Sequence, residues 1–384
     1  MNFEFMFPTK VVMEKGIRKR ISQYIADLQL EKPLIISDHG IGEAGMLHDV
    51  IEDLGQNHIR TSIYLDVKPN PKDNDCHHCA QEIDGKGIDG IIALGGGSVI
   101  DTAKAVSILA TNGGTIKDYE GVNVAEKPPL PLVCIPTTAG TGSEVTSWAV
   151  VTDTKQQYKM AIGDERMIPK LALLDAELLV SLPPAIAAST GLDALTHAIE
   201  AYTCKAANPI SDALALYSIT LISNHLSDSI NLGNIEHKEQ MLVASLVAGA
   251  AFGNADTAAV HCLSEAIGGR YDTPHGEANA MFLPFVFEYN KAADIKRHAD
   301  VARAMGVGIH KSDEEAANRC VAKLFQWNEA LNIPRFHEVP QLNEADLADL
   351  ATRAFQNYSN DDNVRHMEPE DYLFILQTAF NNHR

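Results

Sequence analysis

Apolar and polar residues follow two different patterns along the chain, and the change lies near residue 183. In the first half, short apolar runs typical of β-strands alternate with segments that have helical spacing. The apolar runs lie at residues 33–38, 61–67, 90–97, 130–138 and 171–175, and helical patterns lie at residues 45–54 and 98–110. Strand–helix alternation of this kind predicts a parallel sheet covered by helices. The runs are apolar almost throughout, as expected for strands buried on both faces.

The second half contains long helical patterns and few convincing strands. These patterns lie at residues 186–204, 211–227, 238–252, 256–268, 291–305, 313–331, 344–354 and 369–380. Two consecutive prolines, Pro183 and Pro184, mark a natural boundary because proline stops an incoming element. The sequence therefore predicts an α/β domain over residues 1–183 and an all-helical domain over residues 184–384.

Composition narrows the class of protein. The 384 residues carry a formal net charge of −20, which argues against nucleic-acid binding because that needs a basic face. The first residues carry an acid and no apolar signal-peptide core, and the longest apolar run, residues 241–253, is too short to span a bilayer. Six cysteines are too sparse for a disulfide scaffold, so we expect free thiols and a cytoplasmic protein. The motif Cys76-His77-His78-Cys79 lacks a second cysteine pair, and we interpret it as part of a surface helix rather than a metal site.

A glycine turn follows the predicted strand at residues 90–94. Gly95, Gly96 and Gly97 lead into a helix opened by Ser98, with Asp101 three residues later. Glycines allow close approach of a ligand, and the amides at a helix start favour a phosphate. The motif differs from the G-x-G-x-x-G fingerprint, so a simple tight turn between strand and helix is the alternative.

A second loop at residues 136–146 follows another predicted strand and carries the hydroxyls of Thr137, Thr138, Thr141 and Ser143. Two such loops suit a dinucleotide lying across the carboxyl edge of a parallel sheet. Asp38 ends an earlier strand, where its carboxylate would accept from ribose hydroxyls and repel a 2′-phosphate. That favours NAD over NADP, unless Asp38 is only a turn residue.

Potential metal ligands lie in three segments of the second half. Asp193 and His197 are four residues apart in a helical pattern, which places both on one face. His261 lies in another helical pattern, and His275 lies in an expected turn. One carboxylate and three imidazoles suit a divalent transition metal. Asp193 and His197 could instead form a simple hydrogen-bonded pair, and Glu200 on the same face could support a ligand from behind.

Over essentially its full length the chain resembles the iron-containing, metal-dependent (group III) alcohol dehydrogenases. The resemblance depends on "GGGSVIDTAKA", "PTTAGTGSEVT", "GLDALTHAIEAY" and "YDTPHGEANAMFLP", in that order, with "PNP" and "NGGTIKDYEG" also fitting. It implies a Rossmann-like N-terminal domain and a helical C-terminal domain, the architecture of the dehydroquinate synthases, with the site in the cleft. It also implies that the chain binds NAD and a divalent metal, either Fe²⁺ or another such as Zn²⁺. It further implies that the chain forms a homodimer or a larger homo-oligomer.

The resemblance also implies roles for individual residues. Asp193, His197, His261 and His275 would bind the metal, and Asp38 would contact the adenosine ribose. The other cofactor-binding positions would be Asn70, Gly96, Gly97, Ser98, Asp101, Thr137, Thr138, Thr141, Val150, Lys159 and Leu178.

One position departs from the family pattern. The family usually has a second histidine four residues after the third ligand, and this chain has Glu265 there. We expect Glu265 to share a helix face with His261 and to relay a proton or line the substrate pocket. Its charge favours a polar or cationic substrate, unless it is a solvated residue without a role.

The expected reaction is hydride transfer between NAD and a small primary alcohol, diol or aldehyde. An alternative is a metal- and NAD-dependent carbon–oxygen lyase of the dehydroquinate synthase type, which would need a basic cluster that is not evident beyond Arg270. Another alternative is a zinc enzyme similar to glycerol dehydrogenase, although four candidate ligands rather than three argue against it. A nucleotide-binding protein with a structural metal is the non-enzymatic alternative.

Overall fold

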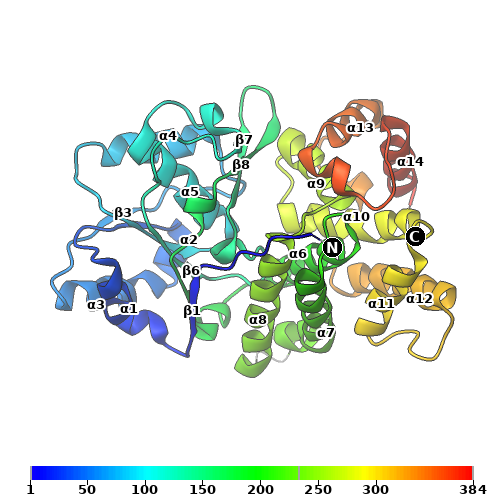
Figure 1. Cartoon of the computed structure of the whole chain (residues 1–384), viewed down its shortest axis with the longest axis horizontal. Coiled ribbons are helices and arrows are strands. Elements are labelled where there is room, and N and C mark those ends of the chain that lie inside the picture. The colour runs from blue at the N-terminus through cyan, green and yellow to red at the C-terminus, as the bar shows by residue number, and fades with distance from the viewer. Residues whose placement is uncertain (1, 232–233, 383–384) are drawn as a thin grey trace. The chain divides into compact units, whose positions relative to one another are not determined.

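The computed structural model describes residues 2–231 and 234–382 (Figure 1). The chain divides into two compact units. One spans Phe7–Leu182, and the other contains the rest of the described chain, including the residues before Phe7. Each unit has its own buried core.

The first unit is built on a six-stranded parallel sheet, in the order β1-β9-β6-β4-β2-β3. Its strands are β1 (Lys10–Met13), β2 (Leu34–Ile36), β3 (Ser62–Tyr64), β4 (Ile91–Gly95), β6 (Leu132–Pro136) and β9 (Leu171–Leu174). Every residue of the strands β2, β4, β6 and β9 is buried. The expected parallel sheet is therefore present, and burial on both faces explains why these strands are apolar throughout.

The first unit also contains α-helices. They are α1 (Ile21–Ile25), α2 (His39–Glu43), α3 (Met46–Gln56), α4 (Asp73–Ile83) and α5 (Gly97–Asn112). Helix α5 packs against β4, β6 and α4, and ten of its residues are buried. The motif at residues 76–79 lies on α4 as expected, but both Cys76 and Cys79 are fully buried, so this helix is only partly a surface helix.

A second, three-stranded sheet was not predicted. It has the order β5-β8-β7 and contains β5 (Gly121–Val122), β7 (Trp148–Asp153) and β8 (Tyr158–Gly163). The strands β7 and β8 form an antiparallel hairpin in which Trp148 lies opposite Gly163. Gly163 accommodates the indole, because a Cβ there would lie 2.7 Å from the Trp148 ring. The hairpin was missed because its strands mix polar and apolar residues without regular alternation.

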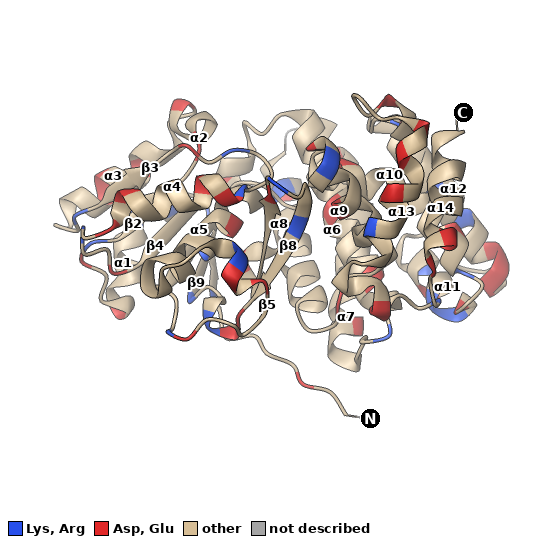
Figure 2. Ribbon diagram, turned by 90° about the horizontal axis from the view of Figure 1, so that it is seen from above, with Lys and Arg blue, Asp and Glu red and all other residues tan. Residues whose placement is uncertain are grey.

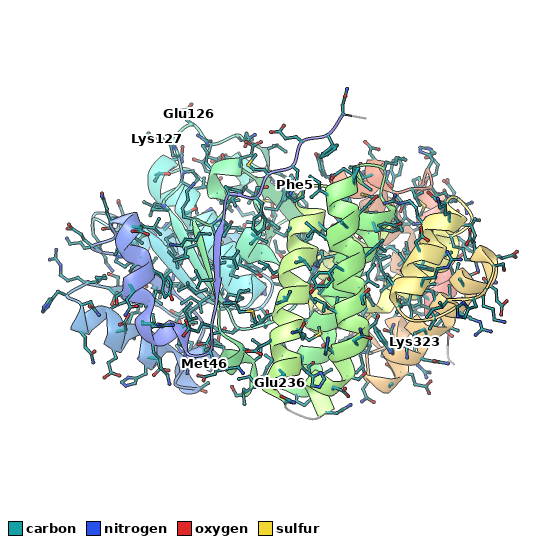
Figure 3. The ribbon with its side chains drawn as sticks, turned by 60° about the horizontal axis from the view of Figure 1, so that its bottom comes forward. Phe5, Met46, Glu126, Lys127, Glu236 and Lys323 are labelled. Atoms are coloured by element: carbon teal, nitrogen blue, oxygen red, sulfur yellow. The ribbon has the colours of Figure 1, made fainter. Side chains whose placement is uncertain are left out.

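The second unit is helical, as expected. Its helices are α6 (Pro184–Thr203), α7 (Pro209–Asn231), α8 (Ile235–Phe252), α9 (Ala259–Tyr271), α10 (His275–Asn290), α11 (Ile295–Ala304), α12 (Asp313–Ala330), α13 (Leu347–Phe355) and α14 (Pro369–Phe380). The helices α6, α7 and α8 pack against one another. Figure 3 shows Glu236 at the start of α8 and Phe5 in the extended segment that precedes the first unit. That segment is held where the Met6 backbone exchanges hydrogen bonds with the Asn254 side chain.

The expectation of a turn around His275 is wrong. His275 is the first residue of α10, which has Pro274 at its N-cap and continues through Pro284. The 16-residue helix was not predicted because one proline precedes it and another lies inside it, and proline disfavours helix in a sequence pattern. The helix matters for function because it directs residues 275 and 279 towards α6, as described below.

The surface reflects the acidic composition. Figure 2 shows acidic residues on both units among fewer basic ones, in keeping with 51 acidic and 31 basic residues. In the described part of the chain no helix is long and apolar enough to cross a membrane.

Candidate metal centre

Helix α6 supplies two of the candidate ligands. Pro184 occupies its first turn, where the missing amide hydrogen costs nothing, and the Ala- and Leu-rich sequence continues to Thr203. Nearly the whole C-terminal part of α6 is buried, including Asp193 and His197. The Asp193 Oδ2 atom lies 4.0 Å from Nδ1 of His197, so the helical spacing does place both side chains on one face.

The other two candidate ligands come from α9 and α10. Ligand atoms from Asp193, His197, His261 and His275 all lie within 4.8 Å of one another. The His275 Nε2 atom is 3.7 Å from Asp193 Oδ1, and the rings of His197 and His261 have centroids 4.7 Å apart. Three helices separated in sequence thus bring one carboxylate and three imidazoles to a single point, a donor set that fits a divalent transition metal.

A glycine allows α10 to approach α6 closely. Gly276 follows His275, and a Cβ at this position would lie 2.7 Å from the carbonyl oxygen of Ser189. Any larger residue would push the two helices apart. The backbone contact therefore fixes how far His275 stands from Asp193.

Glu200 orients His261 from behind. Glu200 is on α6, and its Oε2 lies 2.5 Å from His261 Nδ1. Its two oxygens also accept hydrogen bonds from the backbone amides of Ala258 and Val260 at the start of α9. This carboxylate places the imidazole hydrogen on Nδ1 and leaves the Nε2 lone pair for a metal. The arrangement agrees with the supporting role suggested by the position of Glu200 on the helix face.

The electrostatics favour an ionised Asp193. Burial by itself would raise the pKa of Asp193, but the three nearby imidazoles lower it on balance. Burial would likewise lower the pKa of His261, but the Glu200 carboxylate raises it. His197 is further enclosed by the ring of Phe252, which stacks on it with centroids 4.3 Å apart. The apolar side of the site thus contributes to excluding water.

Glu265 lies one helical turn after His261 on α9 and is half-buried. Its Oε2 accepts a hydrogen bond of 2.6 Å from the side-chain amide of Asn357. Its negative charge contributes to the raised pKa of His261. The carboxylate therefore lies close enough to influence the candidate metal ligands electrostatically.

Sequence reasoning missed Asn279. This residue lies one turn after His275 on α10, is fully buried, and directs its amide nitrogen at Asp193, His261 and His275. The helical spacing of 275 and 279 was the available signal, but it was hidden because the segment was expected to be a turn.

In the first unit, the two expected loops lie side by side at the carboxyl ends of neighbouring strands. The Thr137 amide donates to the Gly95 carbonyl, which joins the loop after β6 to the loop after β4. A Cβ on Gly97 would lie 2.5 Å from the Thr141 side chain, and one on Gly96 would lie 3.1 Å from Thr138. The glycines are therefore required by close packing between the loops.

The start of α5 fits a phosphate. Gly96 is the N-cap of this 16-residue helix, and no side chain caps it. The first amides of a helix attract anions. The Ser98 hydroxyl accepts a hydrogen bond from the amide of Asn70, whose backbone has a left-handed φ of 53°. The Asn70 side chain in turn accepts from Lys159 Nζ at 3.0 Å.

The remaining expected cofactor residues lie as follows. Asp38 is the N-cap of α2, and its carboxylate accepts a hydrogen bond from the Ile41 amide. It follows β2, which lies next to β4 in the sheet. Asp101 accepts from the Ser143 hydroxyl and from the Val150 amide. Leu178 is buried in a 3-10 helix after β9.

A buried lysine, also missed, supports the second loop. Lys104 on α5 is fully buried, and its Nζ donates to Ser143, Thr146 and the Trp148 carbonyl. Burial lowers its pKa, and the neighbouring Asp101 opposes that shift. This network holds the loop at residues 136–146 against α5.

All six cysteines are free and buried. His77 Nε2 accepts a hydrogen bond from the Ile116 amide, and His78 lies near the Tyr64 hydroxyl. Both histidines of the motif at residues 76–79 therefore make contacts within the fold, in agreement with the interpretation that the motif is not a metal site.

Family models, related sequences and solved structures all match this chain to alcohol dehydrogenases and their relatives. The family model for iron-containing alcohol dehydrogenase matches residues 8–176, and the model for the C-terminal region of Fe-containing alcohol dehydrogenases matches residues 187–380. The chain is 36% identical to the NAD-dependent methanol dehydrogenase of Bacillus methanolicus over 98% of this chain and 99% of that protein. It is 35% identical to the choline dehydrogenase of Bacillus subtilis over 98% and 95% of the two chains. The crystal structure of a 1,3-propanediol oxidoreductase superposes with a TM-score of 0.94, at 34% identity, over 99% and 100% of the two chains.

Proposed function

This chain belongs to the iron-containing alcohol dehydrogenase family, and from that premise we propose that it interconverts a small primary alcohol or diol and its aldehyde with NAD as the hydride carrier. The observation that carries the proposal is the convergence of Asp193, His197, His261 and His275. The relatives named for methanol, choline and 1,3-propanediol support this reaction class.

The four converging side chains would hold the metal. A divalent ion bound there would supply Lewis acidity towards an alcohol or carbonyl oxygen, and bound NAD would accept or donate the hydride. The Asp193 carboxylate offsets part of the cation's charge, and Glu200 keeps the hydrogen of His261 on Nδ1. Stacking of Phe252 on His197 limits the approach of water from that side.

The loops of the first unit would bind NAD. The uncapped start of α5, with Gly96, Gly97 and Ser98, would bind the pyrophosphate. Thr137, Thr138 and Thr141 would complete the phosphate site from the adjacent loop, and Asp38 would accept from the adenosine ribose. Asp101, Val150 and Lys104 would hold these loops in place, and Asn70, Lys159 and Leu178 would contribute further cofactor contacts.

Glu265 would take part on the substrate side. Its carboxylate lies one turn from His261 and would accept the hydroxyl proton released during alcohol oxidation, returning it during aldehyde reduction. A negative charge there would also favour a substrate with a second hydroxyl or a cationic group. The choline dehydrogenase relative supports including amino alcohols among the candidates.

The competing lyase function needs cationic side chains for an anionic substrate. Arg270, the basic residue nearest in sequence to the ligand motifs, is engaged by Asp346 and Asp349 at 2.6 Å each. This pairing supports the dehydrogenase over the lyase.

We also propose a cytoplasmic homo-oligomer, a dimer or larger. Six unpaired cysteines favour a reducing compartment. Exposed large apolar side chains, such as Val122, Tyr217 and Phe374, are available for contact between copies. Light scattering on the purified chain would measure the oligomeric state.

The decisive experiment is anaerobic purification with elemental analysis, followed by assay of the same sample with NADH and aldehydes and with NAD and alcohols. We expect about one divalent metal per chain and turnover that depends on it. NADH oxidation that is unaffected by metal removal, or metal without any turnover across the panel, would contradict the proposal.

A further inference from the structure

Asn279 has an unusual position for a neutral side chain. It lies on α10 four residues after His275, and its exposed fraction is 0%. Its Nδ2 atom lies 2.7 Å from Asp193 Oδ1, 3.1 Å from His261 Nε2 and 3.2 Å from His275 Nε2. The amide therefore contacts three of the four side chains that converge on the candidate metal centre.

The bond to Asp193 dominates these contacts. An amide nitrogen has two hydrogens and faces one carboxylate oxygen and two ring nitrogens, so it cannot donate to all three. The Asp193 contact is the shortest and has a charged acceptor, which makes it the strongest. The Nε2 lone pair of His261, which the Glu200 contact leaves free, would be used by a bound metal, so the bond to Asp193 is the contact that remains when the site is filled.

The orientation of the amide follows from the same contacts. Asn279 Oδ1 is buried and has no hydrogen-bond partner in the described part of the chain. If the amide were reversed, its oxygen would lie 2.7 Å from the Asp193 oxygen, and two acceptors would repel each other. The nitrogen therefore faces the carboxylate, even though the oxygen remains without a partner.

We propose that Asn279 is a positioning residue for the metal ligands: its amide fixes the rotation of the Asp193 carboxylate and joins α10 to α6 at this ligand. This inference rests on the proposed function, because it assumes that the four donors bind a divalent ion. Groups that hydrogen-bond to a ligating carboxylate are part of a metal site, and their loss costs about 10–100-fold in metal affinity.

The same helix offers a matched control. Asn290 also lies on α10 and is buried, and its amide donates to Asn363 at 2.7 Å. Replacing Asn290 by Leu removes a buried amide and its hydrogen bonds just as Asn279→Leu does. Only the second change touches Asp193.

The test measures Co²⁺ binding to the full-length chain after metal removal, by visible absorption and by competition with a chelator. We expect Asn279→Leu to weaken Co²⁺ binding by about 10–100-fold, while Asn290→Leu binds as the unmodified chain does. Circular dichroism and NAD affinity identify a variant that fails to fold, and Asn279→Ala then replaces the Leu variant.

The outcomes separate this inference from the proposed function. Equal affinities for the Asn279 variants and the unmodified chain, or an equal loss in Asn290→Leu, would overturn the positioning role. If the unmodified chain binds Co²⁺ no better than His261→Ala does, then the metal centre itself is wrong.

Discussion

The carboxylate of Glu200 lies 2.5 Å from Nδ1 of His261, although the two residues come from different helices and are 61 positions apart. The same carboxylate accepts hydrogen bonds from two backbone amides at the start of α9. A single side chain of α6 therefore sets the position of α9, the tautomer of His261 and the direction of its free nitrogen.

Glu200→Gln should lower metal affinity by about 10–100-fold and lower activity with it. The amide group would put donor hydrogens towards groups that are themselves donors, which disturbs His261 and the start of α9. Metal per chain by elemental analysis, after dialysis against a chelator, measures the effect. Glu236→Gln, at an exposed site on α8, is the control and should retain its metal. Full metal retention in Glu200→Gln would mean that this contact only serves folding.

His261→Ala should abolish turnover and leave NAD affinity largely intact. The imidazole belongs to the candidate metal centre of the helical unit, whereas the expected NAD contacts lie in the α/β unit. Steady-state rates and NADH fluorescence titration measure the two properties separately. A comparable loss of NAD binding would refute the separation of roles.

Glu265→Gln should change the pH dependence of turnover more than the metal content. The substitution keeps the shape of the side chain and its contact with Asn357 but removes the group that would accept a proton. The rate of alcohol oxidation between pH 6 and 10, together with elemental analysis, is the measurement. A collapse of metal content would instead identify Glu265 as a ligand.

Asp256→Asn should make the protein more stable at pH 8 and leave its stability near pH 4 almost unchanged. Burial, with a contribution from the Asp362 carboxylate, raises the pKa of Asp256 to about 7. Between about pH 4 and that value the folded chain holds a proton that the unfolded chain has released, so this carboxyl lowers stability as pH rises. Asparagine has no proton to release, and a pKa raised from 3.8 to about 7 corresponds to a gain at pH 8 on the order of 4 kcal/mol.

Urea unfolding of Asp256→Asn and the unmodified chain at several pH values gives the difference. Asp361→Asn, at an exposed site in the same region, should show none. A difference that does not grow with pH would contradict the prediction.

Gly276→Ala should destabilise the chain by about 1–3 kcal/mol. The added Cβ would lie 2.7 Å from the Ser189 carbonyl oxygen, and α10 would have to move away from α6. Gly55 in α3 has nothing within 4 Å of an added Cβ, so Gly55→Ala should be neutral or slightly stabilising. The free energy of unfolding in urea distinguishes them, and equal values for the two variants would show that α10 shifts without cost.

Some features of this protein were determined by the sequence itself. The buried strands β2, β4, β6 and β9 were predictable because apolar runs of strand length need no partner to be identified. The common face of Asp193 and His197 followed from helical geometry, which is set by residues four positions apart. The glycine turn at residues 95–97 before α5 was likewise a local signal.

Only the tertiary structure decided the rest. The convergence of His261 and His275 on Asp193 depends on how α9 and α10 pack against α6, and no local pattern specifies that packing. Asn279 was missed because α10 begins after a proline and contains another, so its helical face was hidden. A periodic pattern shows which side chains share one face of a helix or strand. Contacts between distant segments determine which residues pack against that face.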